Sequence, residues 1–390
     1  MTARRLRYAM IGGGPGAMIG PIHRIAARID DRWELVAGAL SSDPARAAEG
    51  AAECHIAPER SYADWQTLIA TEAQRPDRID AVAIVTPNHL HAGPAIAALE
   101  AGFHVVCDKP LAASLEDALA IGRAAEASAA TFVLTHTYSG YPMVREMKAM
   151  VASGVLGDLR IIQAQYAQDW LTLPVEKEDN KQAAWRTDPS RSGAGGALGD
   201  IGTHAYHLAS FVTGLRADAL CADLSSFGEG RQLDDNAHLL LRYPGGVKGM
   251  LWVSQVAPGK GNQLRLGVYG SKGGVEWDQE NPNQLRFTRL GEPVAIVERG
   301  GATPRYDGYT TRLPGHHPEG YLEAFGQLYS DAADLILARE AGRLPNGAAA
   351  ALPGIDDGIE GLRFITGAIA SHRAGGWLGR DEWVTGQTTA

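Results

Sequence analysis

The 390-residue sequence lacks several features that would assign it to other classes of protein. Its three cysteines, Cys54, Cys107 and Cys221, are too far apart for a metal or redox motif, as is typical of a reduced cytosolic protein. No apolar run approaches the ~20 residues of a membrane-spanning helix, and glycine follows the short basic start before any signal-peptide core. We therefore expect a soluble, cytoplasmic protein with no metal site.

An excess of positive charge is also missing. The chain has 36 Lys and Arg against 45 Asp and Glu, a formal net charge of −9, so no overall basic field draws it to nucleic acid or to a membrane surface. Apolar residues make up 45% and charged residues 21%, which is ordinary for a globular protein. The length favours two domains rather than one.

Glycine, in contrast, is abundant, and one cluster of it carries a motif. An apolar run, residues 6–11, ends in Gly12-Gly13-Gly14-Pro15-Gly16-Ala17, followed by a helical pattern over residues 19–29. Gly12-x-Gly14-x-x-Ala17 fits the dinucleotide fingerprint, in which a tight turn and a helix N-terminus receive a pyrophosphate. The motif is weak alone, but its strand-and-helix context is right. The residues expected to bind the cofactor here are Gly12, Gly14, Pro15, Gly16 and Ala17.

Strand and helix patterns then alternate through the first third of the chain. After the first strand, strands are predicted over residues 34–40, 81–85, 103–107 and 131–134, and helices over 44–52, 64–71, 91–101 and 115–127. This alternation predicts a Rossmann-type, doubly wound parallel sheet in an α/β domain, residues 1–137. Five strands are one short of the complete fold, which leaves room for a sixth after a helix over residues 141–153.

The end of the second strand bears on the choice between NAD and NADP. An acid there would bind a free ribose, and a basic residue nearby would accept a 2′-phosphate. Ser41 stands where the acid is expected, and Asp43 and Arg46 follow. Ser41 with Arg46 would hold a phosphate, Asp43 would turn back to a ribose, and Arg46 is equally consistent with an exposed helix charge. We therefore predict NAD or NADP as the cofactor, NAD(P), and slightly favour a protein that accepts NADP.

The remainder, residues 138–390, has a different pattern. An alternating run over residues 159–170 is followed by strand-like segments in direct succession, separated by glycine, proline and asparagine; they span 237–243, 247–255, 263–270, 274–278 and 284–290. Succession of this kind predicts an α+β domain on a mainly antiparallel sheet. Helices are predicted over 318–339 and 355–372. The long loop over residues 172–199 exceeds the needs of a connection and is expected to carry function.

Two short segments hold the residues with chemical potential. Lys109 follows a buried-type strand in Cys107-Asp108-Lys109-Pro110, where it is better placed to face a cleft than to be solvated on a surface. If Asp200 opens a helix, it shares a face with His204 at i+4. Taken alone, Asp200 is more simply a helix cap and His204 a packed histidine, and His207 is structural.

Together, the glycine fingerprint, Asp108-Lys109-Pro110 and Gly195-Gly196-x-x-x-Asp200-Ile-Gly-x-His204 resemble the Gfo/Idh/MocA oxidoreductase family. The resemblance extends through the segment around His317. It implies hydride transfer between nicotinamide and a carbinol carbon of a sugar, glycoside or inositol-type polyol. The family's lysine, aspartate and histidine fall on Lys109, Asp200 and His204. Where the family usually has glutamate this chain has Asp108, which shortens the side chain next to the lysine.

The resemblance also implies further contacts. The cofactor contacts it adds are Thr86, Pro87, Asn88, His89, Asp108 and Lys109. The substrate contacts are Lys109, Arg186, Asp200, His204 and His317, although Arg186 is equally consistent with a surface ion pair. For the chemistry, His204, with a pKa near ~6.5 when unperturbed, can accept the hydroxyl proton. Lys109 can stabilise a developing alkoxide, and Asp200 can orient a hydroxyl or the lysine. The sequence leaves open whether Lys109 or His204 is the principal base.

Two other functions stay open on the sequence alone. Some relatives hold NAD tightly and recycle it during glycoside hydrolysis or elimination, and a non-catalytic nucleotide sensor can use the same fold. The intact lysine, aspartate and histidine argue against the sensor. We expect a small sugar or polyol as the partner, neither nucleic acid nor a membrane, and a homodimer or homotetramer formed through an exposed sheet face.

Overall fold

The computed structural model describes residues 4–178, 180–301 and 311–385. The chain divides into two compact units. The first comprises Met1–Thr137 and Tyr321–Ile359, and the second comprises Tyr138–Gly320 and Glu360–Ala390. None of the helices within the described ranges is both long and apolar enough to cross a membrane.

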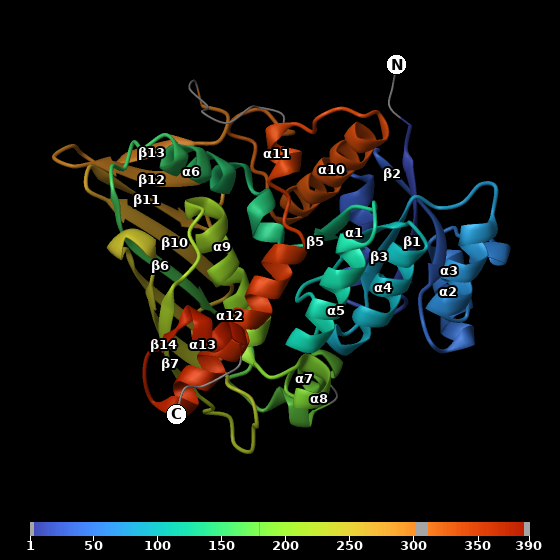
Figure 1. Ribbon diagram of the computed structural model, residues 1–390, viewed down its shortest axis with the longest axis horizontal. Coiled ribbons are helices and arrows are strands. Elements are labelled where there is room, and N and C mark those ends of the chain that lie inside the picture. Colours follow the sequence, from blue (N-terminus) through green and yellow to red (C-terminus); the bar gives the residue numbers. More distant parts are fainter. Residues whose placement is uncertain (1–3, 179, 302–310, 386–390) are drawn as a thin grey trace. The chain divides into compact units, whose positions relative to one another are not determined.

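A five-stranded parallel sheet forms the centre of the first unit, in the order β2-β1-β3-β4-β5 (Figure 1). Its strands are β1 Leu6–Gly12, β2 Trp33–Ala39, β3 Ala81–Val85, β4 His104–Cys107 and β5 Phe132–Leu134. All five residues of β3 are buried, which explains why this strand is apolar throughout rather than alternating. The chain runs from β1 to β2 on one side and returns to β3 on the other, so the strand order reverses at β1, where such sheets bind ligands.

Helices join these strands and cover the sheet. They are α1 Ile19–Arg28, α2 Pro44–Glu53, α3 Trp65–Gln74, α4 Ala92–Glu100 and α5 Leu115–Glu126, with the short 3-10 turns η1 Pro58–Arg60, η2 Asn88–Leu90 and η3 Thr137–Gly140. Ser114, Asp43 and Asp64 accept first-turn N–H groups as N-caps of α5, α2 and α3. The alternation predicted from the sequence is confirmed, with bounds shifted by a few residues.

A segment from the far end of the chain also belongs to the first unit. The sequence grouped residues 321–359 with the second domain, but α10 (Tyr321–Glu340) packs against α1 of the first. The physical reason is its apolar face. Phe325, Tyr329 and Ile336 join the same buried cluster as Tyr8 and Trp33. The Trp33 indole N–H donates to the Tyr329 carbonyl over 2.8 Å, which fixes the helix on the start of β2.

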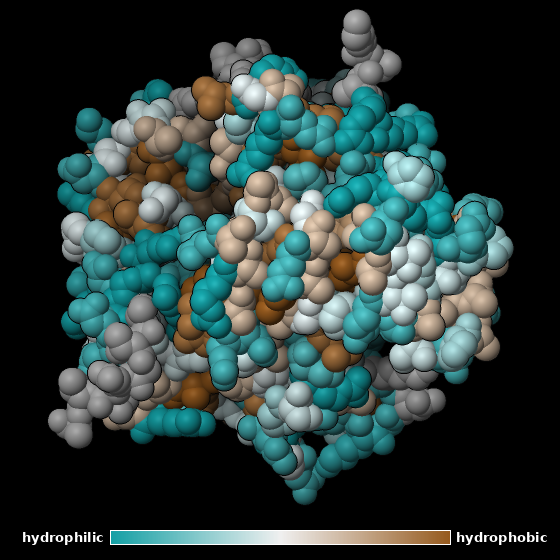
Figure 2. Space-filling model, turned by 45° about the vertical axis from the view of Figure 1, so that its right-hand side comes forward, coloured by the Kyte–Doolittle hydropathy of each residue, from teal (hydrophilic) through white to brown (hydrophobic). Residues whose placement is uncertain are grey.

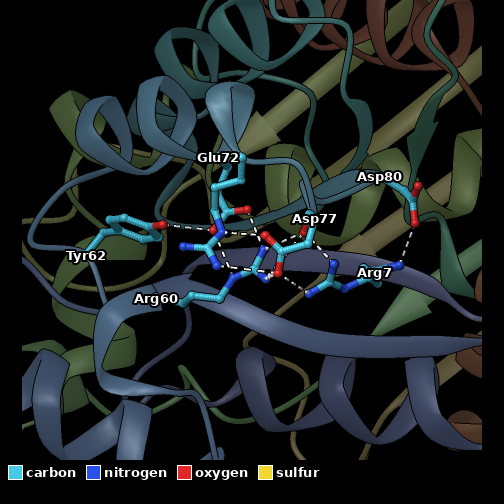
Figure 3. Close-up of polar contacts among 7 residues, drawn as sticks. Arg7, Arg60, Tyr62, Glu72, Asp77 and Asp80 are labelled. Atoms are coloured by element: carbon cyan, nitrogen blue, oxygen red, sulfur yellow. Dashed lines mark hydrogen bonds and ion pairs between the residues drawn. The ribbon is translucent and has the colours of Figure 1, made fainter.

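A buried ion pair between Arg60 and Glu72 lies at the centre of a polar network in this unit (Figure 3). Arg60 Nε donates to Glu72 Oε1 over 3.0 Å, and both residues are at most 4% exposed. The Tyr62 hydroxyl donates to the same carboxylate, and burial, with that hydrogen bond, raises the pKa of Tyr62 to about 12. Asp77 links Arg60 to Arg7 near the start of β1. The network ties the second crossover to the first strand.

The second unit is built on a nine-stranded sheet in the order β13-β12-β11-β10-β6-β9-β8-β7-β14. The strands are β6 Leu159–Ala167, β7 Ala219–Ser225, β8 Asn236–Arg242, β9 Lys248–Ser254, β10 Gln263–Gly270, β11 Gly273–Asp278, β12 Gln284–Arg289, β13 Ala295–Glu298 and β14 Leu378–Gly379. Among the described strand pairs of this second sheet, only β6–β9 is parallel. The predicted class, a Rossmann sheet followed by a mainly antiparallel one, is confirmed.

The strand that follows the helix over residues 141–153 is β6, and it does not complete the first sheet as a sixth strand. It pairs instead between β10 and β9. The reason is its alternation, since Ile162, Ala164 and Tyr166 are buried while the residues between them are not. A sheet covered by helices on one face favours that pattern.

Helices cover one face of this sheet (Figure 1). Helix α9 (Thr203–Thr213) contacts β6, β9 and β10, and α6 (Pro142–Ala152) contacts β11 and β12. The remaining helices are η4 Val175–Lys177, α7 Lys181–Arg186, α8 Pro189–Ser192, the π-helical turn η5 Leu198–Gly202, η6 Pro244–Gly246, α11 Gly347–Ala350, α12 Ile355–Ala374 and α13 Arg380–Thr385. The face of the molecule in Figure 2 is mostly hydrophilic, with hydrophobic residues in small areas.

Candidate active site

The glycine-rich turn after β1 is shaped by close backbone approach. Gly12 has a φ of +82°, and a Cβ on it would lie 2.9 Å from the Thr86 methyl carbon. The Gly14 N–H donates to the Leu40 carbonyl over 3.1 Å, and a Cβ on Gly14 would lie 2.5 Å from that oxygen. Glycine is required at both positions because a side chain would collide with the ends of β2 and β3. The turn can therefore receive a ligand only through its backbone.

Two arginines hold this turn through its carbonyl groups. Arg24, on α1, donates to the Gly13 carbonyl over 2.7 Å, and Arg46, on α2, donates to the Pro15 carbonyl. The Ala17 N–H closes the turn on the Gly14 carbonyl over 3.0 Å. Helix α1 begins at Ile19 with Met18 at its N-cap, and methionine has no oxygen to accept the first-turn N–H groups. These donors, at the positive end of the helix, suit an anion.

The segment after β2 contains the residues expected to read the ribose. The Asp43 carboxylate accepts the Arg46 N–H over 2.9 Å as the N-cap of α2, and the Asp43 N–H donates to the Ser41 hydroxyl. The Asp43 carboxylate is thus hydrogen-bonded to the first turn of α2. Arg46 is exposed, as a surface charge would be, but its guanidinium lies beside Gly16, 3.5 Å from where a Cβ would stand. Arg46 is therefore a neighbour of the glycine turn.

Residues 86–89 follow β3 in the same unit. Thr86 and Pro87 are partly buried, Asn88 is buried and His89 is exposed in the 3-10 turn η2. Because parallel strands end at the same edge, these residues lie at the carboxyl edge of the sheet, as do the glycine turn and Ser41. That residues 86–89 contact the cofactor stays a prediction.

Lys109 follows β4 at this same edge, and Asp108 organises its backbone. The Asp108 Oδ1 atom accepts the Lys109 N–H over 2.9 Å and the Thr135 hydroxyl over 2.9 Å, and it lies 3.8 Å from His23 Nε2. Burial alone would raise the pKa of Asp108, but the His23 imidazole and the Lys109 charge outweigh it and lower the pKa to about 2. The carboxylate is therefore ionised at neutral pH beside the lysine.

The edge formed by these loops fits a nicotinamide dinucleotide. The turn offers N–H groups without side chains, and the positions where a Cβ on Gly12 or Gly14 would stand are closed by neighbouring atoms. Arg46 supplies positive charge next to the turn. The residues that would hold the group are those of the glycine turn, Ser41, Arg46 and residues 86–89.

In the second unit, Asp200 lies in the first turn of a helix, after the N-cap residue Ala197. The π-helical turn Leu198–Gly202 runs directly into α9, and the Asp200 N–H donates to the Gly196 carbonyl over 2.9 Å. The interpretation of Asp200 as a helix cap is therefore wrong, although it does lie at the beginning of the helix. A π-helical turn widens the helix by one residue and recurs at functional sites. Asp200 and His204 are still on consecutive turns.

The turn is fixed by a buried acid that the sequence did not single out. The Asp234 carboxylate accepts the N–H groups of Gly196 and Leu198 over 2.8 and 2.7 Å, and its carbonyl accepts that of Ala197. A Cβ on Gly196 would collide with the Asp234 carbonyl, which explains the glycine. Burial raises the pKa of Asp234. This anchor sets where Asp200 points.

Two side chains hold the Asp200 carboxylate. Gln255 Nε2 donates to Asp200 Oδ2 over 2.9 Å, and Arg186 Nε lies 3.3 Å from the same oxygen. Arg186 also donates to the Gln182 side chain over 2.6 Å and stacks over Trp185. Arg186 is thus paired with a predicted site residue. Gln255 was missed because it follows β9, 55 residues from Asp200, and no local pattern marks it.

His204 and His207 lie on α9. The His204 ring is 8% exposed and meets Tyr138 edge to face, with ring centres 4.9 Å apart at 90°. Tyr166 is tilted against the same ring at 6.2 Å. His207 is buried and stacks on Phe211 at 5.9 Å, which agrees with a structural role. The aromatic contacts fix the orientation of the His204 imidazole.

His317 lies in a turn at the end of the second unit. Its side chain is exposed, and Nδ1 lies 3.3 Å from the Gly315 carbonyl. Arg299, buried in an ion pair with Glu319, donates to the His317 carbonyl and shapes the turn. The contacts of His317 are thus with its own turn, and its substrate role stays a prediction.

Comparison with known proteins agrees with this geometry. Residues 6–136 match the family model described as "Oxidoreductase family, NAD-binding Rossmann fold", and residues 144–276 match the model of the GFO/IDH/MocA C-terminal domain. The first match covers all five strands of the first unit's sheet, and the second covers β6 to β10 and part of β11 in the second unit. The resemblance stated from the sequence is confirmed.

Similar proteins cover about three quarters of the chain or more. An uncharacterized oxidoreductase, YfiI of Bacillus subtilis (strain 168), is 35% identical over 96% of each chain. The levoglucosan dehydrogenase of Pseudarthrobacter phenanthrenivorans is 30% identical over 73% of this chain and 76% of its own. The crystal structure of an inositol dehydrogenase homolog from Azotobacter vinelandii, complexed with NAD+, is 39% identical, with a TM-score of 0.91 over 97% of this chain and 98% of that one.

Proposed function

The chain belongs to the GFO/IDH/MocA family of NAD-binding oxidoreductases, and we propose that it is a dehydrogenase that oxidises a secondary alcohol of an inositol-type polyol, sugar or glycoside. The observation that carries this proposal is Lys109 at the carboxyl edge of the first sheet, its backbone held by Asp108. The second support is Asp200, held by Arg186 and Gln255. A bound nicotinamide would supply the hydride acceptor.

The roles of the side chains follow from their chemistry. Oxidation of an alcohol requires loss of the hydroxyl proton as hydride leaves the carbon. Lys109, as an ammonium group, stabilises negative charge that develops on the oxygen. His204 accepts a proton through its imidazole, whose aromatic contacts limit rotation. Asp200 accepts a hydrogen bond from a substrate hydroxyl.

The substrate class is supported by the donors and acceptors around Asp200. Its carboxylate, the amides of Gln255 and Gln168 and the Arg186 guanidinium together offer both acceptors and donors. Such mixed groups suit a molecule with many hydroxyls. The names of two similar proteins agree, a levoglucosan dehydrogenase and an inositol dehydrogenase homolog studied with NADH and myo-inositol.

Turnover of a substrate panel by matched variants tests this function. Purified protein is incubated with NAD or NADP and with inositols, levoglucosan and pentoses, and reduced nicotinamide is measured by absorbance. We expect turnover with at least one polyol, and a loss in kcat of roughly 10²–10³ in Lys109→Ala. Lys272→Ala, at an exposed turn between β10 and β11, is the control. Full activity in Lys109→Ala contradicts the mechanism.

Lys109→Ala and a second variant, His204→Asn, identify the principal base. If His204 is the base, His204→Asn removes the rise of kcat/KM with pH near the pKa of a histidine, and Lys109→Ala keeps it. If Lys109 is the base, the rise of kcat/KM follows the pKa of the lysine, Lys109→Ala removes it and His204→Asn keeps it. The pH profile of each variant therefore assigns the proton acceptor.

We propose that NADP is accepted as well as NAD. Ser41 is neutral, Asp43 serves as the cap of α2, and Arg46 brings a guanidinium to the glycine turn. A phosphate on the ribose would find a positive charge there, and the carboxylate that usually repels it is engaged elsewhere.

We propose that the uncovered face of the second sheet joins copies of the chain. Ile161, Leu240 and Met250 on this face are 45–51% exposed, and Leu240 is opposite Met250 in the pairing of β8 with β9. The adjoining strands carry both signs of charge, with Arg265 paired to Asp278 over 2.6 Å. A hollow of about 490 Å³ on these strands can receive side chains of a second copy. An apolar strip beside mixed charges is complementary to itself in a two-fold pair.

A cytoplasmic location is also proposed. The three cysteines, Cys54, Cys107 and Cys221, are unbridged thiols, as a reducing compartment would keep them. Cell fractionation with antibody detection checks this location, and a secreted or membrane fraction would contradict it.

A further inference from the structure

A buried histidine outside the predicted site connects two of its loops. His91 is 1% exposed, between the turn η2 and helix α4. Its Nδ1 atom lies 2.9 Å from the Pro110 carbonyl, and its Nε2 atom lies 2.8 Å from the Thr86 carbonyl. Both ring nitrogens are therefore used, and each contacts the backbone of a different loop.

The two loops are those that carry the proposed chemistry in the first unit. Pro110 directly follows Lys109, and Thr86 begins the loop of Pro87 and Asn88. The Thr86 methyl group also abuts the glycine turn, since a Cβ on Gly12 would lie 2.9 Å from it. A ring held between these two carbonyls sets the spacing of the lysine loop and the cofactor loop.

The contacts require a polar ring at this place. A carbonyl oxygen only accepts, and a neutral imidazole has one N–H, so a neutral ring donates to one loop at a time and a protonated ring to both. Burial lowers the pKa of His91, while the two carbonyl contacts and the nearby Asp108 charge act in the opposite direction. An apolar residue of equal size would fill the space without donating to either carbonyl.

We propose that His91 is a positioning residue that holds the Lys109 loop and the Thr86 loop in register, so that the lysine stands at a fixed place relative to a bound nicotinamide. The inference rests on the proposed dehydrogenase function for its kinetic consequence. Its two contacts are separable, because they are made by different atoms of one ring. We expect the Thr86 contact to affect the affinity for NADH and the Pro110 contact to affect kcat.

Two amide substitutions separate the contacts. In His91→Asn the amide nitrogen takes about the place of Nδ1, which preserves the Pro110 contact and loses the Thr86 contact. In His91→Gln it takes about the place of Nε2, which preserves Thr86 and loses Pro110. We expect Asn to weaken NADH binding about tenfold with kcat nearly unchanged, and Gln to lower kcat at least about tenfold with NADH affinity nearly unchanged.

A control and a stability measurement accompany these variants. His104→Asn alters another histidine of the first unit, on β4, whose Nδ1 accepts the Thr131 N–H, and we expect neither property to change. Thermal unfolding checks that both His91 variants remain folded. Equal losses of affinity and kcat in the Asn and Gln variants, or no loss in either, overturn the proposal, because a merely structural histidine predicts no split.

The lysine contact can also be measured without any substrate. After reductive methylation with ¹³C-formaldehyde, the dimethyl resonance of Lys109 is followed as NADH is added. We expect saturating NADH to shift this resonance by the same amount in wild type and in His91→Asn. In His91→Gln we expect a smaller shift. An unchanged shift in His91→Gln overturns the inference. If no polyol is turned over but the NADH-induced shift still differs between His91→Asn and His91→Gln, the proposed function fails while the positioning role stands.

Discussion

Asp108 shows how a single residue supports the chemistry without performing it. Its carboxylate accepts the backbone N–H of Lys109 and the Thr135 hydroxyl, and its charge faces His23. His23 in turn lies 2.8 Å from the Tyr329 hydroxyl on α10. The lysine loop is therefore tied to helices α1 and α10. The family's usual glutamate would place the carboxylate one methylene farther out, so the shorter residue fits a tighter arrangement here.

The pH dependence of stability tests the charge on Asp108. A folded pKa of about 2, below the unfolded value of ~3.9, means that ionised Asp108 stabilises the fold above pH ~4, and that this contribution is lost as pH falls toward 2. We expect Asp108→Asn to lower the free energy of unfolding by about 1–2 kcal/mol at pH 7. Chemical denaturation at several pH values measures the difference.

The control for this variant is Glu49→Gln, which likewise replaces a carboxylate by its amide, at an exposed position on α2 of the same unit. We expect its free energy of unfolding to follow that of wild type at each pH. The difference between wild type and Asp108→Asn should shrink as the pH falls below ~4. A constant difference from pH 7 to pH 3 would show that the asparagine acts through packing and not through charge.

Single residues also show what sequence could and could not predict. Lys109, Asp200 and the glycine turn were found because each lies in a short local pattern. Gln255, Asp234 and His91 were missed because their partners are distant along the chain or are backbone carbonyls, which leave no mark in the sequence. Sequence patterns identify the groups that bear chemistry better than those that hold them.

At the scale of elements, the sequence pattern predicted the ends of a strand correctly where a single local feature, such as burial or a glycine, determines them. Strand β3 (Ala81–Val85) was predicted at its bounds because it is buried on both faces. Strand β10 (Gln263–Gly270) was also predicted at its bounds, since Gly270 ends it. The π-helical turn at Leu198–Gly202 was not predicted, because it depends on the Asp234 carboxylate 36 residues away. Strand β6 was predicted as an alternating run over residues 159–170 in the second domain, and it joins that domain's sheet between β10 and β9.

The connection between β2 and α2 is the element that we propose decides the choice between NAD and NADP. If Arg46 binds a 2′-phosphate, Arg46→Ala should raise the KM for NADP by about tenfold or more and the KM for NAD by less than about threefold. Steady-state kinetics with both cofactors measures this. Arg123→Ala, at an exposed site on α5, serves as the control. Equal effects on NAD and NADP would mean that Arg46 acts only by holding the Pro15 carbonyl.

At the scale of the whole molecule, the order of the chain does not follow the two compact units. Residues 321–359 belong to the first unit although they follow most of the second unit along the chain, because the apolar face of α10 completes the core around Tyr8 and Trp33. No local pattern distinguishes a helix that covers its own sheet from one that covers an earlier sheet. The division of the chain therefore required tertiary contacts.

The oligomeric state tests the proposed role of the uncovered sheet face. Met250→Asp places a charge opposite Leu240, where burial against a second copy would be costly, so we expect a lower mass in solution. Light scattering after size exclusion measures this mass. Leu344→Asp, at a residue 93% exposed in the first unit, is the matched control and should leave the mass unchanged. A wild-type monomer would contradict the proposal.

Transfer of deuterium tests the proposed hydride transfer most directly. A polyol that is turned over is prepared with deuterium on its carbinol carbons, and the cofactor released by the protein is analysed by mass spectrometry. We expect one deuterium in the reduced nicotinamide for each ketone formed. With Lys109→Ala we expect almost no ketone and almost no deuterated nicotinamide in the same time. Product that forms while the nicotinamide stays oxidised would contradict the dehydrogenase function and would indicate a recycled cofactor.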